Sequence, residues 1–313
     1  MALSLREQPQ GHRTPVAVEP RRRRSSSLWA WALLVPSLAL VTALIAYPLA
    51  TGISLSLHSV VLNRPGLGRP FVGLENYARL LTDATVRTAL VNTVIYVVVG
   101  VVSQLLLGLG AAVLLNRSSR LAWVARTAVM LPWFMPPVVA AYMWAFMLDP
   151  RYGILTRLAG GLGIDTGSQG VFADPGLALW GVLLVELWRS YPFFALFFLA
   201  GLQGIPEELR DATAVDGATR WQHFWHVTVP LLRPVILVSS LLEGIRLANS
   251  PTLILLLTNG GPGDATQVLS LYAFQQAYLK FDFGYASSIA VAMLALIIGF
   301  SIVYIRTAGG GRD

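Results

Sequence analysis

Long apolar runs without charged residues constrain the fold of this chain more than any other feature. Between Arg24 and Arg64 no residue is charged, and residues 28–50 form an almost uninterrupted apolar stretch. A helix of this length crosses the hydrocarbon core of a bilayer, which is about 30 Å thick. Five more runs have a similar character, so the predicted spans are residues 28–50, 86–116, 124–148, 177–202, 235–257 and 285–305. The sequence therefore predicts an all-α polytopic membrane protein with six transmembrane helices.

Composition supports a membrane protein and excludes several other classes. Of 313 residues, 55% are hydrophobic and only 12% are charged, whereas a soluble domain carries about 25% charged residues. The net charge of +7 comes almost entirely from arginines that lie beside apolar runs, which indicates membrane orientation better than nucleic-acid binding. The absence of cysteine excludes disulfides, thiol catalysis and cysteine-ligated metals.

The N-terminal arginines precede the first apolar run, as they do in a secretory signal peptide. That run is longer than a signal peptide requires, and it ends at Tyr47-Pro48 without a small-residue cleavage site. We therefore expect it to remain as the first span. Residues 1–27 are predicted to be a basic, disordered cytoplasmic tail, residues 28–306 the membrane domain, and residues 307–313 a short cytoplasmic tail.

The distribution of basic residues predicts the orientation of the spans. If the N-terminus is cytoplasmic, the inside segments hold 14 basic residues and the outside segments hold seven. This twofold excess agrees with the positive-inside rule. Both termini and the segment between the fourth and fifth spans are therefore predicted to be cytoplasmic.

That cytoplasmic segment has the pattern of a helix, a turn and a second helix. Pro206 suits the first position of a helix, and two glutamates follow it where negative charge is favourable. Leu209, Ala212 and Val215 then recur at three-residue spacing, and Gly217 follows where a helix often ends in a left-handed turn.

A second apolar face follows the turn. It consists of Trp221, Phe224 and Trp225, while Pro230 and Pro234 are expected to mark the point where the chain leaves the membrane surface. From these patterns alone, the segment is either an ordinary amphipathic interfacial loop or a surface built for a partner.

The spacing of the segment resembles a known family motif. Asp211-Ala212-Thr213 is followed by three residues, Gly217, nine residues, Val227, one residue and Val229-Pro230. This resembles the Glu-Ala-Ala loop of ATP-binding-cassette (ABC) importer permeases, with Asp for Glu and Thr for the second Ala. The resemblance implies a coupling helix that packs into a groove on an ATP-hydrolysing subunit. The residues expected to take part are Leu209, Asp211, Ala212, Thr213, Asp216, Gly217, Trp221, Phe224 and Pro230.

Other segments extend the resemblance over nearly the whole chain after the first span. They are residues 71–77 (FVGLENY), 200–206 (AGLQGIP), 257–262 (LTNGGP) and 284–287 (GYAS). They resemble the carbohydrate-uptake permeases of the maltose and glycerol-3-phosphate type. The resemblance implies a heterodimer with a second permease subunit, two ATPase subunits and an extracytoplasmic solute-binding protein, in a bacterial or archaeal cell membrane. The expected solute is a sugar or a sugar derivative, and a non-carbohydrate solute is the alternative.

The chain lacks the motifs of nucleotide hydrolysis. Its single lysine, Lys280, is not in a Gly-rich loop, and no phosphate-binding loop of the G-x-x-x-x-G-K-[ST] type exists. We therefore expect a transport subunit without enzymatic activity or a cofactor, with ATP and magnesium bound by the partner ATPases. His223 and His226 lack a third ligand and do not indicate a metal site.

Four charged residues fall inside predicted spans. Glu186 and Arg189 lie in the fourth span, and Glu243 and Arg246 lie in the fifth. Residues three apart are neighbours on a helix, so each pair can neutralise itself, or the pairs can cross between the helices. Intramembrane charges often line a transport path, which makes these residues candidates for contact with the solute. The alternative is that they only join helices or subunits.

A proline interrupts the fifth span. Pro251 is expected to free the carbonyl of Leu247 and to bend or break the helix, with Asn249 at the break. Interrupted helices often form solute sites in transporters, so Asn249 is a further path candidate. An ordinary packing kink is the alternative, and Pro251-Thr252 departs from the Phe-Asp that many sugar-type permeases carry at this position.

Two glycine-rich strings have simpler interpretations. Gly108-Leu109-Gly110 opens no dinucleotide-binding unit and is expected to serve helix packing. The string from Gly261 to Asp264 resembles the Gly-x-Gly-Asp of aspartyl intramembrane proteases. Those enzymes need two aspartates within the membrane, and Asp264 is expected in an outside loop, which makes a protease the weaker hypothesis.

Overall fold

The computed structural model describes residues 26–309, except residues 65, 67, 117–119, 165, 166 and 168. It divides into two compact units, Met1–Ala50 and Thr51–Asp313. The predicted tail over residues 1–27 lies outside the described residues apart from Ser26 and Ser27, with which the first helix begins. Of the predicted C-terminal tail, residues 307–309 continue the last helix and the rest lie outside the described part.

The first unit is helical over its described residues. Helix α1 (Ser26–Val41) continues through a π-turn, η1 (Thr42–Ala46), into α2 (Tyr47–Ser56), which extends into the second unit. Residues 34–56 of this helix are long and apolar enough to cross a membrane, as the first apolar run predicts.

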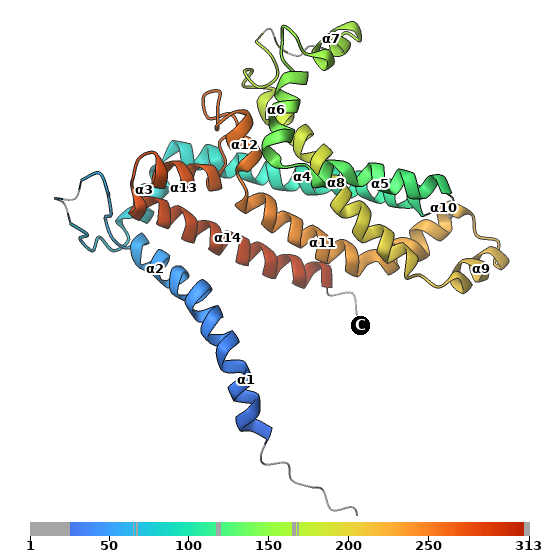
Figure 1. The fold of residues 1–313 in the computed structure, drawn as a ribbon, viewed down its shortest axis with the longest axis horizontal. Coiled ribbons are helices and arrows are strands. Elements are labelled where there is room, and N and C mark those ends of the chain that lie inside the picture. Colours follow the sequence, from blue (N-terminus) through green and yellow to red (C-terminus); the bar gives the residue numbers. More distant parts are fainter. Residues whose placement is uncertain are drawn as a thin grey trace, which may run out of the picture. The chain divides into compact units, whose positions relative to one another are not determined.

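The second unit is also built from helices (Figure 1), and its described residues contain no β-strand beyond two isolated bridges. Its helices include α3 (Glu75–Thr82), α5 (Arg120–Phe134), α6 (Pro137–Met147), α7 (Ile154–Gly161) and α13 (Leu269–Tyr278). The remaining elements are α4 (Ala84–Leu115), α8 (Ala178–Gln203), α9 (Glu207–Val215), α10 (Arg220–His223), η3 (Phe224–Thr228), α11 (Val229–Asn249), α12 (Thr252–Leu257) and α14 (Phe283–Gly309).

Five of the six predicted spans have a single helix of sufficient length, and the third span differs from the prediction. Within the described residues, five helices are long and apolar enough to cross a membrane, and a bent helix pair makes the sixth. The pair joins Trp123–Phe134 and Pro137–Met147 at an angle of 96°. The prediction of one continuous helix over residues 124–148 was wrong, because Pro136 and Pro137 lack N–H donors and hold Met135 and Pro136 out of the helical conformation.

The fifth span also differs at both of its ends. Its helix begins before the predicted start at residue 235, since α10, η3 and α11 form one span from Arg220 to Asn249. The expectation that Pro230 and Pro234 separate the surface helix from the span was therefore wrong. The π-turn η3 precedes Pro230 and closes with the Val229 N–H on the Phe224 carbonyl, so the chain stays helical across the prolines.

The expected break near Pro251 is present. Helix α11 ends at Asn249, Ser250 is extended with ψ at 97°, and α12 begins at Thr252. The break leaves the last helical turn of the fifth span as a separate short helix inside the bundle.

Helix α4 shows how the bundle packs. Its buried residues recur every three or four positions, as one face of a helix requires, and they are Val86, Ala89, Asn92, Tyr96, Gly100, Gln104, Gly108, Ala112 and Leu115. Helix α8 packs along this face. A Cβ atom at Gly108 would lie only 2.9 Å from the backbone nitrogen of Ala195 on α8, so glycine permits the close approach. The interpretation of this glycine as a packing residue is confirmed.

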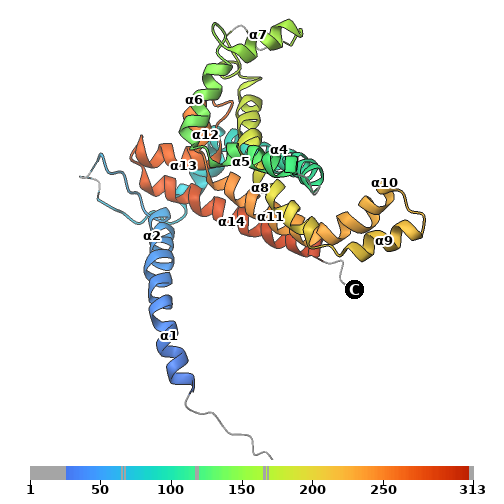
Figure 2. The same ribbon diagram turned by 45° about the vertical axis from the view of Figure 1, so that its right-hand side comes forward.

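Three apolar clusters follow one another along the second unit. The central cluster surrounds Tyr96 and Leu247, a second lies around Tyr272 and Tyr285, and a third contains Phe194. Figures 1 and 2 show the corresponding arrangement: α9 and α10 lie at one end of the bundle, and α13 lies at the other. The α9–α10 segment and α13 are thus separated by the length of the spans.

Candidate functional site

The turn between α9 and α10 has a well-defined geometry. Helix α9 starts after Pro206, which is the N-cap residue and not, as expected, the first helical position. It ends in a Schellman motif, in which Gly217 has φ of +76°. Two hydrogen bonds close the motif: the Gly217 N–H donates to the Ala214 carbonyl at 3.1 Å, and the Ala218 N–H donates to the Thr213 carbonyl at 3.0 Å. The left-handed glycine predicted from the sequence is confirmed.

Polar contacts hold the second helix against the first. The Thr213 hydroxyl and the His223 Nδ1 atom are 2.8 Å apart, and they join α9 to α10 across the turn. Thr219 and Gln222 form a capping box at the start of α10. These contacts fix the start of α10 and connect the two helices of the segment.

This segment exposes apolar side chains. Trp221 is 70% exposed and Val215 is 88% exposed, although Trp221 also packs edge-on against Trp225 at 5.6 Å between ring centroids. The exposed aromatic and aliphatic residues of the segment are Leu209, Val215, Trp221 and Trp225. An exposed apolar patch of this kind marks a site of contact with a protein, a membrane or a ligand. Asp211, Ala212 and Asp216 are exposed on the same segment, whereas Phe224 is partly buried.

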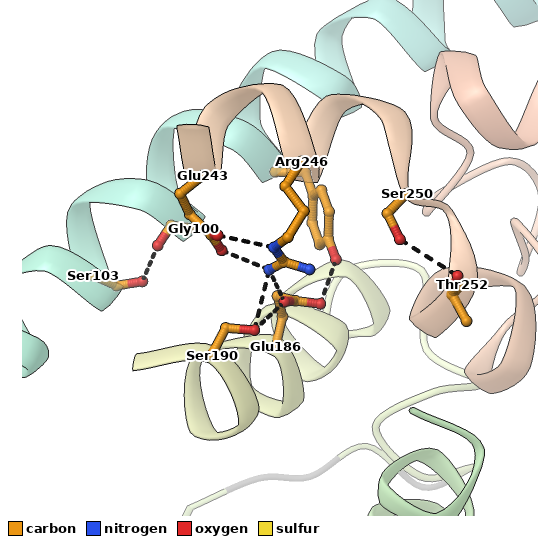
Figure 3. A network of polar contacts seen from close by, with 9 residues as sticks. Gly100, Ser103, Glu186, Ser190, Glu243, Arg246, Ser250 and Thr252 are labelled. Carbon is orange, nitrogen blue, oxygen red and sulfur yellow. Dashed lines mark hydrogen bonds and ion pairs between the residues drawn. The ribbon is translucent and has the colours of Figure 1, made fainter. Parts of the chain in front are cut away.

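Three of the four intramembrane charges, Glu186, Glu243 and Arg246, form one cluster around Arg246 (Figure 3). The Arg246 Nη2 atom lies 2.5 Å from Glu243 Oε1 on the same helix and 2.5 Å from Glu186 Oε1 on α8. The Arg246 Nε atom donates to Glu243 Oε2 at 2.8 Å. Of the two arrangements left open by the spacing, self-pairing and crossing between helices, Arg246 adopts both.

Two residues that sequence reasoning missed complete the cluster. Ser190 donates to Glu186 Oε1 at 2.6 Å, and Tyr96 on α4 donates to Glu186 Oε2 at 3.1 Å. Ser190 lies four residues after Glu186, which was a usable signal for a side-chain contact. Tyr96 carried no such signal, because only the packing of α4 against α8 brings its hydroxyl to the glutamate.

Arg189 and Asn249 do not join this cluster. Arg189 forms no ion pair among the described residues, and its Nε atom is buried without a hydrogen-bond partner. Asn249 is exposed at the end of α11 and donates to the Ile245 carbonyl at 2.9 Å. Beside it, the Ser250 and Thr252 hydroxyls lie 3.3 Å apart across the helix break (Figure 3).

A second polar cluster lies where α4, α13 and α14 meet. The hydroxyls of Tyr272 and Tyr285 each donate to Asp83 Oδ2 at 2.7 Å, and Asp83 Oδ1 accepts from the Thr85 N–H as the N-cap of α4. Burial raises the pKa of the Asp83 carboxyl, but these hydrogen bonds outweigh burial and hold the pKa below its ordinary value. The cluster joins α4, α13 and α14.

The remaining sequence candidates have structural surroundings. The His226 Nδ1 atom lies 2.9 Å from the Gln222 carbonyl, and the described residues contain no group of three potential ligands for a metal ion. Asp264 is exposed in the turn after α12, where its carboxylate accepts a hydrogen bond from Thr85 at 3.3 Å. Because it lies outside the spans, it does not supply an intramembrane protease with a catalytic aspartate.

Comparison with known proteins identifies the family. Residues 104–308 match the family of binding-protein-dependent transport system inner membrane components. The trehalose/maltose transport system permease protein MalF of Thermococcus litoralis is 34% identical over 281 residues, which cover 90% of this chain and 94% of that protein. The sulfoquinovosyl glycerol transport system permease protein SmoG of Agrobacterium fabrum is also 34% identical, over 89% of this chain and 90% of that protein. Both relatives are transport permeases, which agrees with the prediction of a transport subunit and not an enzyme.

The fold agrees with this assignment. One chain of a bacterial ABC transporter involved in the import of the acidic polysaccharide alginate superposes with a TM-score of 0.77 and 19% identity, over 92% of this chain and 97% of that chain. The family match over residues 104–308 includes the α9–α10 segment and the four intramembrane charges. This chain belongs to the binding-protein-dependent transport system inner membrane components and is a multi-pass permease subunit of an ABC importer.

Proposed function

We propose that this permease imports a carbohydrate or a carbohydrate derivative. The relatives in Thermococcus litoralis and Agrobacterium fabrum are named for trehalose/maltose and for sulfoquinovosyl glycerol, and a fold neighbour imports alginate. In this proposal, an extracytoplasmic solute-binding protein delivers the solute. A second, different permease subunit completes the membrane pathway, and two separate ATPase subunits bind ATP and magnesium, so this chain carries no cofactor.

The α9–α10 segment supports the contact with an ATPase subunit. Its Schellman turn at Gly217 and the Thr213–His223 contact make it a compact projection, and Leu209 and Trp221 present apolar surface from it. The residues proposed to take part are Leu209, Asp211, Ala212, Thr213, Asp216, Gly217, Trp221, Phe224 and Pro230. This projection is the observation that carries the proposed function.

The fifth span supplies the mechanical link. Helices α10, η3 and α11 form one span from Arg220 to Asn249, with Arg246 near its far end. Closure of the ATPase subunits moves α9 and α10, and the continuous helix transmits this movement to the charge cluster and to the break at Ser250. The cycle then alternates between outward-facing and inward-facing states, each favoured by a different nucleotide state of the motor.

The charge cluster marks the proposed solute path. Glu186, Arg189, Glu243 and Arg246 lie inside spans, and Asn249 lies at the interrupted end of α11. Intramembrane charges and helix breaks are features of transport sites near the middle of a bilayer. In the proposed orientation, both termini and the α9–α10 segment are cytoplasmic, in the cell membrane of a bacterium or an archaeon.

Uptake of radiolabelled sugars and sugar phosphates tests this proposal. Cells with and without the gene are compared while the other transporter genes remain in place, and the wild-type gene is returned on a plasmid. We expect uptake of one solute to disappear without the gene and to return with it. Unchanged uptake of every carbohydrate in the panel contradicts the solute class. A plasmid that carries the Gly217→Val variant should restore less uptake than the wild-type gene does. Equal restoration of uptake by the two genes contradicts the role of the α9–α10 segment.

A further inference from the structure

The charge cluster offers more unused hydrogen-bond donors than reachable acceptors. The Arg246 Nη2 and Nε atoms bind Glu186, Ser190 and Glu243, but its Nη1 atom forms no hydrogen bond within the described residues (Figure 3). The Arg246 side chain is 34% exposed, whereas those of Glu186 and Glu243 are 3% and 2% exposed. A solute that reaches the cluster therefore meets the guanidinium and not the carboxylates.

The carboxylate oxygens are already engaged. Glu186 Oε1 accepts from Ser190 and Arg246, and Glu186 Oε2 accepts from Tyr96. Both oxygens of Glu243 accept from Arg246. Because these oxygens are buried as well as occupied, they cannot accept hydrogen bonds from the hydroxyl groups of a solute.

Arg189 adds a second guanidinium with unused donors. It follows Glu186 by three positions on α8, so the two side chains lie on neighbouring parts of the same helical face. No ion pair joins Arg189 to a described residue, and its buried Nε atom has no hydrogen-bond partner. A buried donor of this kind costs free energy unless a partner reaches it.

A neutral carbohydrate does not match this arrangement well. Its hydroxyl groups both donate and accept, so a site for it needs reachable acceptors as well as donors. An anionic group only accepts, and the planar guanidinium binds carboxylate, sulfonate or phosphate oxygens through paired hydrogen bonds. The cluster supplies the chemistry that an anion requires.

From these observations we propose that the imported solute carries an anionic group, which Arg189 and the exposed edge of Arg246 bind during passage. The proposal rests on the function proposed above, because it assumes that the solute path passes this cluster. It specifies that the solute is negatively charged, and it gives different roles to the four intramembrane charged residues. Glu186 and Glu243 position Arg246, and the two arginines contact the solute.

Arg189 is the residue at which to test the proposal, since replacing it leaves the Arg246 ion pairs in place. Arg189→Gln removes the charge, and Arg189→Lys retains it. Arg87→Gln is a matched control, because Arg87 is an exposed arginine in the first turn of α4, away from the cluster. Each variant is purified as the full transporter with its partner permease and ATPase subunits and is reconstituted with the binding protein in liposomes.

Uptake is measured in three sets of probes: neutral sugars, the corresponding uronic acids and sugar phosphates, and dicarboxylates that are not carbohydrates. We expect uptake of an acidic sugar. Arg189→Gln should raise its KM by about tenfold or more, with Arg189→Lys closer to wild type and Arg87→Gln unchanged. ATPase activity without solute is measured in parallel, and Arg87→Gln should keep it at the wild-type level.

The other results overturn one or both proposals. Uptake of neutral sugars alone overturns the anionic solute but not the carbohydrate importer. Uptake of dicarboxylates alone, with the same dependence on Arg189, overturns the carbohydrate and supports the anion. No uptake in any set overturns both. If Arg189→Gln instead prevents the partner permease from co-purifying, Arg189 pairs with that subunit, and the role in solute binding is overturned.

Discussion

The Nη2 atom of Arg246 on α11 lies 2.5 Å from Oε1 of Glu186 on α8, although 60 positions separate the two residues in the sequence. The same nitrogen is 2.5 Å from Glu243 Oε1. One guanidinium therefore holds two buried carboxylates, and it joins two spans at the level where Tyr96 of a third span donates to Glu186.

Removal of the arginine alone should destabilise the protein strongly. Arg246→Met leaves two neighbouring carboxylates in the bundle without a cation, and an uncompensated buried charge costs about 3–5 kcal/mol. We expect a large fall in the thermal unfolding midpoint of the purified transporter in detergent. Wild-type stability of this variant contradicts a close ion pair.

Neutralising all three residues should restore much of that loss. Arg246→Met combined with Glu186→Gln and Glu243→Gln leaves no unpaired charge in the cluster. Replacing only Glu243 together with Arg246 should restore less, because Glu186 still lacks its cation. The thermal unfolding midpoints should therefore rise from the single to the double to the triple variant. A double variant as stable as the triple one shows that Glu186 does not depend on Arg246.

Gly217 should be needed for coupling because of its backbone conformation. No heavy atom lies within 4 Å of a Cβ built at this position, so added size alone is tolerated, but its φ of +76° disfavours a β-branched side chain. Gly217→Val should strain the turn by about 1–2 kcal/mol and reduce uptake per ATP hydrolysed. Gly217→Asn is the matched control, since asparagine accepts left-handed geometry. Equal coupling in the two variants contradicts this explanation.

Two glycines of α4 provide a test of helix packing. A Cβ atom at Gly108 would meet Phe194 and the Ala195 backbone, whereas nothing lies within 4 Å of a Cβ atom at Gly110. Gly108→Ala should therefore destabilise the protein by about 1–3 kcal/mol through overpacking. Gly110→Ala on the same helix should be neutral or slightly stabilising in the same thermal unfolding experiment. A larger effect at Gly110 contradicts the described contact of α4 with α8.

Asp83 should make stability depend on pH at the acidic end. Its pKa in the folded protein is lowered from 3.8, so its contribution is fully present above the unfolded pKa and is lost as pH falls through the folded pKa. Asp83→Asn should lower the unfolding midpoint at neutral pH. The difference from wild type should narrow in acid, as the pH falls through the lowered pKa of the wild-type carboxyl. A difference that does not change between neutral and acidic pH contradicts the role of the charged form.

Much of the fold could be predicted because its signals are local. Each apolar run is long enough to span a bilayer, and Gly217 follows an amphipathic helix where a left-handed residue is needed. The bend of the third span was missed although Pro136 and Pro137 signalled it. The continuity of α10 with α11 was also missed, because a π-turn before Pro230 keeps the chain helical where prolines usually mark a boundary.

The candidate site could be predicted only in part. Spacing along a helix identified Glu243 and Arg246 as possible partners, and they do form an ion pair. The same spacing suggested that Glu186 and Arg189 pair, but Glu186 instead binds Arg246, and Arg189 has no ion pair among the described residues. The two Glu-x-x-Arg sequences have the same spacing but form different contacts, because the packing of α8 against α11 decides which arginine reaches Glu186.

The sequence by itself determined the apolar runs, the helix break near Pro251, the left-handed turn at Gly217 and the membership of the family, since each depends on composition, backbone preference or spacing within one segment. Only the tertiary structure decided that Arg246 holds Glu186 and that Arg189 keeps its donors unused. These contacts join residues of different helices, and the packing of α4, α8 and α11 sets the distances between them. A charge in a bilayer needs a partner, and the fold determines which one it finds.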